Sequence, residues 1–194
     1  MNNNNPYKYV VIGFNASGKM SVANKLREMG IKVGQTFRST ESVGNQYSIS
    51  STIYDVEEVN NLFESQQYLF IKESVNKANK YYEGISHYEY QNNDVFVMTP
   101  DQFNTVARFD ENIIFVWLDN NTTQRRFRHH AEKRKYDFNR QEAIEKEYIQ
   151  DFTDRLGDNA ILYFCNEEPD RVAAIIYSLI NHPDLVETYI KAFN

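Results

Sequence analysis

The segment Gly13-Phe14-Asn15-Ala16-Ser17-Gly18-Lys19 constrains the fold more than any other part of the chain. It follows the apolar run at residues 7–12, which predicts a buried strand, and it opens a segment with helical spacing. A loop in this position turns several backbone N–H groups toward one point at a helix N-terminus, where a phosphate binds, and lets the lysine reach the outer phosphates. The order of elements therefore predicts a phosphate-binding loop in an α/β fold, with ATP or GTP as the ligand.

The position after the lysine departs from the usual pattern of such a loop. A hydroxyl that holds Mg²⁺ normally stands there, but this chain has Met20, and Ser21 follows one place late. The ending Gly18-Lys19-Met20-Ser21 resembles the phosphate loops of some phage-type deoxynucleotide kinases, in which the hydroxyl comes one position later, and this resemblance implies Ser21 as the magnesium ligand. Two other interpretations remain open: a chance glycine turn before an ordinary helix, and a loop that still shapes the fold but has lost turnover. The predicted nucleotide contacts are Gly13, Asn15, Ala16, Ser17, Gly18, Lys19, Met20 and Ser21.

Composition narrows the class of protein. A chain of 194 residues with 41% hydrophobic content can bury one core, so we expect a single domain over residues 1–194. The net charge of −6 argues against a nucleic-acid partner. The single Cys165 cannot form an internal disulfide and is predicted to be a core residue, which fits a reducing compartment. The Asn-rich start does not have the pattern of a cleavable signal, and no apolar run approaches the roughly 18 residues of a membrane span, so we expect a soluble, cytoplasmic protein.

Apolar runs and helical spacing alternate along the chain, which predicts a parallel sheet covered by helices. Strands are expected at residues 7–12, 68–71, 95–98, 113–118 and 160–165. Helices are expected at 19–29, 56–64, 101–108 and 170–180, with a last short helix after Pro183. The charged stretch 122–156 predicts a helix-turn-helix arm with its turn near 136–139. Tyr88 and Tyr90 lie two residues apart and are predicted to share one face of a strand.

Four further segments, taken in order with the loop, resemble the guanylate kinase family over residues 7–180. They are Gln35-Thr36-Phe37-Arg38, the stretch 53–69, Tyr81-Tyr82-Glu83-Gly84, and the arginine-rich run 124–130. The resemblance implies a three-layer P-loop kinase fold with a parallel central sheet. It also implies a small acceptor-binding subregion at about 36–92 and a helical lid with its following helix at about 122–156.

The resemblance assigns roles to individual residues, with ATP and Mg²⁺ as cofactors. Lys19 would contact the donor β- and γ-phosphates, and Arg38 would hold the acceptor phosphate through a bidentate fork. Tyr82 would bond the same acceptor phosphate. Arg125 and Arg128 would close over the transferring group from the lid. Lys19, Arg38, Arg125 and Arg128 are thus the predicted catalytic residues; a solvated helix face or a nucleic-acid patch are the other interpretations of the basic run.

Several family positions are changed in this chain. The segment Ser39-Thr40-Glu41-Ser42 lacks the family's second acceptor-phosphate arginine, the guanine-reading glutamate falls at about Phe70, and Thr99-Pro100 replaces the acid after the strand 95–98. The preference for guanine is therefore not carried over. The groups predicted to read a different base are Asn76, Asn79, Thr99 and Gln102.

The leading hypothesis is an ATP-dependent kinase that transfers the γ-phosphate to a (deoxy)nucleoside monophosphate, with base specificity altered relative to guanylate kinase. The alternatives are a catalytically silent guanylate kinase-like domain that binds a nucleotide or a protein, and a P-loop kinase acting on a modified-base or non-nucleotide acceptor. The expected partner is a small-molecule nucleotide, with no membrane contact and with a homodimer left open.

Overall fold

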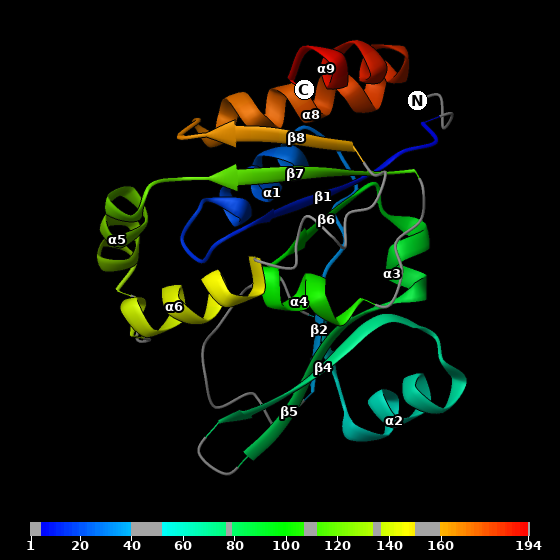
Figure 1. Ribbon diagram of the computed structural model, residues 1–194. Coiled ribbons are helices and arrows are strands. Elements are labelled where there is room, and N and C mark those ends of the chain that lie inside the picture. The colour runs from blue at the N-terminus through cyan, green and yellow to red at the C-terminus, as the bar shows by residue number, and fades with distance from the viewer. Residues whose placement is uncertain are drawn as a thin grey trace.

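The computed structural model describes residues 5–39, 52–76, 79–106, 112–133, 137–149 and 160–193 (Figure 1). Its centre is a sheet of four parallel strands in the order β6-β1-β7-β8. Their bounds are Lys8–Gly13 for β1, Val95–Met98 for β6, Ile113–Asp119 for β7 and Ala160–Cys165 for β8. These four strands confirm four of the five predicted runs. Because β1 is paired along both edges, the loop that follows it starts from the middle of the sheet.

Alternate residues of these strands point to opposite faces of the sheet and build two separate cores. On β1, Tyr9 and Val11 belong to one core, and Val10 and Ile12 belong to the other. Helices α1 (Lys19–Glu28), α8 (Pro169–Asn181) and α9 (Val186–Phe193) contribute to the first core. Helix α4 (Pro100–Thr105) and α3 (His87–Asn92) lie on the second face, so the molecule has three layers (Figure 1).

The predicted helices agree closely with the structure where it describes them. Helices α1, α2 (Val56–Ser65) and α8 match the expected ranges to within one residue at each end. The prediction for 101–108 corresponds to α4, and residues 107–108 lie outside the described part. The short 3₁₀ turn η2 (Pro183–Leu185) precedes α9, the predicted last helix. No helix in the described part is long and apolar enough to cross a membrane.

A second sheet, in the order β3-β2-β5-β4, packs below the first one (Figure 1). Its strands are β2 (Phe37–Ser39), β3 (Thr52–Tyr54), β4 (Tyr68–Asn76) and β5 (Asn79–Ser86). The run 68–71 was expected in the parallel sheet, and this expectation is wrong: it begins β4, which pairs antiparallel with β5. Alternation of side chains identifies a strand but does not say which strand it pairs with. Phe70 and Ile85 dock this sheet on the second core.

Two further expectations are corrected by the structure. Tyr88 and Tyr90 lie in helix α3, where the hydroxyl oxygen of Ser86 accepts a hydrogen bond from the N–H of Glu89 at 3.2 Å and caps the helix. Tyr90 is therefore buried, whereas Tyr88 is 72% exposed. Cys165 is exposed rather than part of the core, because it is the last residue of β8 at the open edge of the sheet.

The charged stretch forms an arm of two helices, α5 (Thr122–Ala131) and α6 (Phe138–Ile149). This confirms the helix-turn-helix prediction for the described residues, although α6 already begins inside the expected turn. Residues 134–136 and 150–156 lie outside the described part. We call α5 and α6 together the α5–α6 arm; it lies beside the carboxyl ends of the central strands (Figure 1).

Candidate active site

The phosphate loop, residues 13–19, joins β1 to α1 and depends on two glycines. A Cβ on Gly13 would lie 2.6 Å from the carbonyl oxygen of Leu118 in the neighbouring strand, so only glycine lets β1 and β7 approach there. Gly18 has a φ of 97°, a conformation that side chains rarely adopt. Its missing Cβ also leaves room for Arg128, whose Nη1 would otherwise be 2.9 Å away.

Lys19 is folded back over this loop. Its side chain is buried, with 7% of the residue exposed, and its Nζ donates hydrogen bonds to the carbonyl oxygens of Gly13 at 2.6 Å and Phe14 at 2.7 Å. The loop itself is closed by a bond from Ser17 N–H to the carbonyl oxygen of Phe14 at 3.1 Å. A positive charge is thereby held where the first turn of α1 presents its N–H groups, which is the arrangement that binds a polyphosphate.

Both predicted arm arginines contact the loop region. Arg128 donates from Nη1 to the carbonyl oxygen of Ser17 at 2.9 Å. Arg125 is only 2% exposed; its guanidinium lies over the ring of Phe14, with Cζ 4.5 Å from the ring centroid, and it pairs with Glu142. The Nη1 atom of Arg125 is buried without a hydrogen-bond partner among the described residues. An inward-held guanidinium with an unused donor can serve an anion at the loop.

The structure adds a residue that the sequence analysis missed. Glu145 of α6 is 1% exposed, and both of its carboxylate oxygens lie 3.0 Å from the backbone nitrogen of Asn15 in the loop. The side-chain amide of Asn15 donates to the same carboxylate. Burial raises the pKa of Glu145, although Lys19, the Asn15 amide and Arg125 oppose that shift. One glutamate in a highly charged helix carries no motif, so only the three-dimensional structure identifies it.

Ser21 and Met20 lie on the first turn of α1, and both are exposed. A thioether is a poor ligand for Mg²⁺, which prefers oxygen. Within the described residues, no group of three or more histidine, cysteine, aspartate or glutamate side chains could hold a metal ion. Mg²⁺ bound with nucleotides uses few protein ligands and several phosphate oxygens and waters. A single hydroxyl from Ser21 therefore fits that chemistry, and a cage made of protein groups alone does not.

The second sheet holds the predicted acceptor residues. Arg38 lies on β2 opposite Glu83 of β5, and its side chain is outside the described part. The hydroxyl of Tyr82 donates to Glu73 at 3.3 Å, and its N–H donates to the Ser39 hydroxyl oxygen at 3.0 Å. Ser39 is buried and supports Tyr82. It begins the segment in which this chain lacks the second arginine of the guanylate kinase family.

A polar network joins the second sheet to α4. Lys72 of β4 pairs with Asp101, and Gln102 donates from Nε2 to Glu83 at 3.2 Å. Thr99, a predicted substrate contact, donates its N–H to the side-chain oxygen of Gln102 at 3.0 Å. The sequence analysis named Thr99 and Gln102 but missed the three charged members, because β4 and α4 are far apart in the chain. The side chains of Asn76 and Asn79 lie outside the described part.

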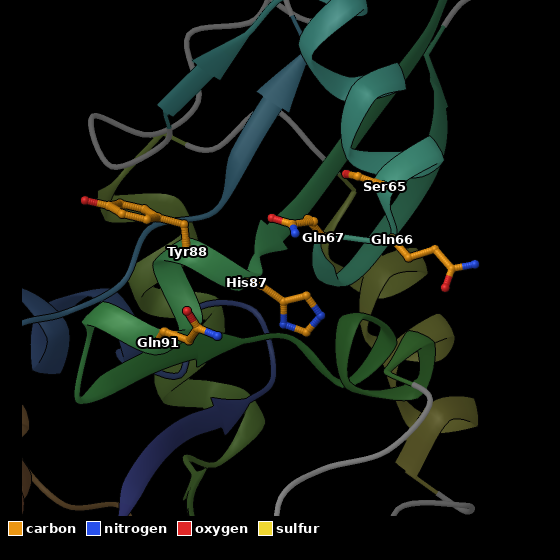
Figure 2. Close-up of a pocket in the computed structure, with 6 residues that line it drawn as sticks. All are labelled: Ser65, Gln66, Gln67, His87, Tyr88 and Gln91. Carbon is orange, nitrogen blue, oxygen red and sulfur yellow. The ribbon is translucent and has the colours of Figure 1, made fainter.

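A shallow polar hollow of about 370 Å³ lies elsewhere, between the end of α2, the start of β4 and α3 (Figure 2). It is lined by Ser65, Gln66, Gln67, His87, Tyr88 and Gln91. Helix α3 ends just before β6 begins, so the hollow lies near the amino ends of the central strands. The phosphate loop lies at their carboxyl ends, where ligands bind in open parallel sheets. None of the predicted site residues lines the hollow.

No protein-family model matches the chain, and no curated protein matches it significantly. Among solved structures, the chain is similar to a guanylate kinase from Anaplasma phagocytophilum, with 14% identity and a TM-score of 0.55 over 91% of this chain and 85% of that one. Two other solved structures match with TM-scores too low to bear on the fold. A shikimate kinase from Acinetobacter baumannii in complex with shikimate gives 0.43 at 9% identity, covering 93% and 97% of the two chains. A sugar kinase from Janibacter sp. HTCC2649 gives 0.42 at 13% identity, covering 91% and 95%.

The guanylate kinase likeness bears on the fold alone, because its identity is low. Together with the phosphate loop at the carboxyl end of a central parallel strand, it identifies the architecture. The chain has a mixed α/β fold of the P-loop kinase type, with a parallel central sheet of four strands flanked by helices.

Proposed function

We propose that the protein is a phosphotransferase that moves the γ-phosphate of ATP to the phosphate of a (deoxy)nucleoside monophosphate, with a base preference different from that of guanylate kinase. One observation carries this proposal: Lys19 and Arg128 both bond to backbone carbonyls of the phosphate loop, and Arg125 lies over its Phe14 ring. Three cations gathered on one loop suit the charge that develops in phosphoryl transfer.

The proposed roles divide between the two sheets. Lys19 holds the donor phosphates, and Arg125 and Arg128 approach the transferring group from the α5–α6 arm. Arg38 and Tyr82 hold the acceptor phosphate from the second sheet, with residues 36–92 as the acceptor subregion and 122–156 as the lid. Ser21 supplies a hydroxyl to Mg²⁺, which neutralises phosphate charge when bound. An acceptor phosphate is already ionised near neutral pH, so its attack needs no general base.

The groups around the acceptor support an altered base preference. Beside Thr99, the network offers the Lys72 ammonium and two carboxylates, those of Glu83 and Asp101. A base whose edge carries both N–H groups and an atom that accepts hydrogen bonds would match this set better than an apolar substrate would. We therefore propose Thr99 and this network as the substrate-reading residues.

A coupled phosphoryl-transfer assay with Mg-ATP tests the proposal, using a panel of ribo-, deoxyribo- and base-modified monophosphates. Lys19→Ala should abolish turnover while leaving the circular dichroism spectrum unchanged. Lys32→Ala removes an exposed lysine just beyond α1 and is the matched control, which should keep full activity. Equal activity of the wild type and Lys19→Ala would refute the kinase assignment.

A silent nucleotide-binding domain is the second candidate. Two observations favour it: Met20 stands where a magnesium-holding hydroxyl is usual, and the Glu145 carboxylate already bonds to the loop. Under this candidate the wild type binds ATP but turns over no member of the panel. Calorimetry with ATP tests whether the protein binds the nucleotide at all. A kinase whose acceptor is outside the panel would also bind ATP, so an acceptor of another class must be tried to distinguish it from a silent domain.

A further inference from the structure

The Glu145 carboxylate bonds to a phosphate-loop amide in the way that a bound anion would. Its two oxygens share the Asn15 N–H, and the Asn15 side chain closes over the same group. Arg125 Nη1 lies 4.0 Å from one of these oxygens, and Lys19 contributes a favourable charge interaction. An internal carboxylate therefore uses the donors and cations that an outside phosphate would use.

These contacts are difficult to combine with a bound polyphosphate. Two like charges a few ångströms apart in a poorly solvated site repel each other strongly, and water cannot screen them there. A phosphate that entered the loop would also compete for the Asn15 N–H directly. The carboxylate must therefore leave the Asn15 N–H before a phosphate can bind there, and protonation weakens its hold by removing its charge.

We propose that Glu145 is a built-in competitor for the phosphate loop, so that a polyphosphate binds only by displacing its carboxylate and releasing helix α6 from Asn15. The inference rests on the proposed function in one respect, namely that the loop's ligand is a polyphosphate. It goes further in assigning the Glu145 carboxylate a blocking role at the loop. Binding at the loop and the position of α6 are then two readouts of one equilibrium.

The groups that face Glu145 come from every element packed against it. They are Lys19 from α1, Asn15 from the loop, Arg125 from α5 and Gln141 from α6 itself, whose Nε2 lies 3.4 Å from Oε1. Glu142 pairs with Arg125 and so draws part of its charge away from Glu145. Burial raises the pKa of Glu145. Protonation then removes the competing charge at a higher pH than for an ordinary glutamate.

The test compares ligand affinities of wild type, Glu145→Gln and Glu147→Gln by calorimetry, with Mg-ATP and, separately, with inorganic sulfate. Glutamine keeps an acceptor for the Asn15 N–H but removes the charge. We expect Glu145→Gln to bind both ligands about tenfold more tightly or better. Glu147 is exposed on the same helix, so its variant controls for the loss of one charge and should bind like the wild type. Equal or weaker binding by Glu145→Gln would overturn the proposal, because the carboxylate would then be supporting the loop.

A second variant keeps the test decisive if Glu145→Gln does not fold. Asn15→Ala removes one of the bonds that hold the carboxylate but keeps the loop N–H, so sulfate should bind severalfold more tightly. Unchanged or weaker sulfate binding by this variant would count against the proposal in the same way. Sulfate also separates the proposed kinase function from the proposed competition by Glu145. If the variants bind sulfate as predicted but the protein neither binds nor turns over ATP, the kinase function is refuted and the competition by Glu145 still stands.

The pH dependence gives an independent readout. The ratio of the sulfate affinities of Glu145→Gln and wild type should exceed one near pH 8, where the wild-type carboxylate is charged, and should fall toward one as the pH is lowered through the raised pKa of Glu145. Every other titratable group is the same in the two proteins, so its effect on sulfate binding cancels in the ratio. A ratio of one at every pH would overturn the proposal.

Discussion

At the scale of single residues, the phosphate loop requires a residue without a side chain at position 18. Gly18 adopts a positive φ and gives Arg128 the space to reach the Ser17 carbonyl. Gly30, at the end of α1, has a similar φ of 84°, but nothing lies within 4 Å of the place where its Cβ would be. The two glycines share a backbone requirement and differ only in what surrounds them.

This difference makes a matched pair of substitutions. Gly30→Ala should lower the free energy of unfolding by about 1 kcal/mol, the cost of a left-handed conformation for a residue with a Cβ. Gly18→Ala should show that loss and should also bind ATP more weakly, because the new methyl group displaces Arg128. Urea unfolding and calorimetry measure the two effects. If both variants kept wild-type ATP affinity, the contact between Arg128 and the loop would have no part in binding.

Single residues also show where prediction from sequence stops. Lys19 and Gly18 were identified from a local motif, since the loop is a contiguous segment whose geometry follows from its own residues. Glu145 was missed because it lies more than a hundred residues away in the chain and meets Asn15 only when α6 packs on the loop. Arg126 was not among the predicted catalytic residues, and the structure has it exposed and bonded to Asn139.

At the scale of elements, the Glu142 carboxylate is one of the groups that join the two helices of the α5–α6 arm. Glu142 of α6 accepts a hydrogen bond from the Thr122 hydroxyl at 2.8 Å and pairs with Arg125. Burial opposes its charge, but Thr122, Arg125 and Lys146 outweigh burial and lower the pKa of Glu142. The start of α5 and the middle of α6 are thereby fixed to each other.

Removing this carboxylate should loosen the arm. We expect Glu142→Ala to reduce the free energy of unfolding by about 1–3 kcal/mol, because the buried Arg125 guanidinium loses its strongest partner. Glu147→Ala, on the exposed face of α6, should change it by less than about 0.5 kcal/mol. Chemical denaturation of the two variants provides the measurement, and equal losses would contradict this role for Glu142.

The elements themselves were the most predictable level of structure. The four central strands and helices α1, α2 and α8 follow from apolar periodicity and from glycine and proline stops, which are local signals. The assignment of β4 to the parallel sheet failed because strand pairing is decided by distant partners. The strand expected at Tyr88 and Tyr90 failed because the Ser86 cap favours a helix, and two tyrosines at a spacing of two are weak evidence against one.

At the scale of the whole molecule, the ion pair between Lys72 and Asp101 joins the second sheet to the central layers. Burial opposes both charges, but their mutual attraction prevails: it lowers the pKa of Asp101 and raises the pKa of Lys72. The contribution of Asp101 to stability is present above its unfolded pKa of about 3.9 and is lost as the pH falls through its lower folded pKa. The contribution of Lys72 is present below about pH 10.4 and is lost as the pH rises through its higher folded pKa.

Asp101→Asn should therefore lower the free energy of unfolding by about 1–3 kcal/mol at neutral pH, where it leaves a half-buried lysine without its partner. The difference from wild type should shrink below about pH 4, where the wild-type carboxylate also takes up a proton. Asp184→Asn, at an exposed turn, is the control. Urea unfolding from about pH 3 to about pH 8 tests this, and a constant difference across that range would show that the pair is not the cause.

The path of the chain into and out of the second sheet has a consequence for how well that sheet can be replaced. The chain leaves the central layers at Gly34, whose N–H bonds to the carbonyl oxygen of Val95 at 2.8 Å, and it returns through α3 to β6, where Asp94 N–H bonds to the carbonyl oxygen of Lys32 at 2.9 Å. Exit and re-entry thus lie side by side at the start of one strand, and a segment inserted between adjacent ends disturbs its host little. We expect the second sheet to tolerate replacement as a unit, while the central sheet and the loop at residues 13–19 keep their structure.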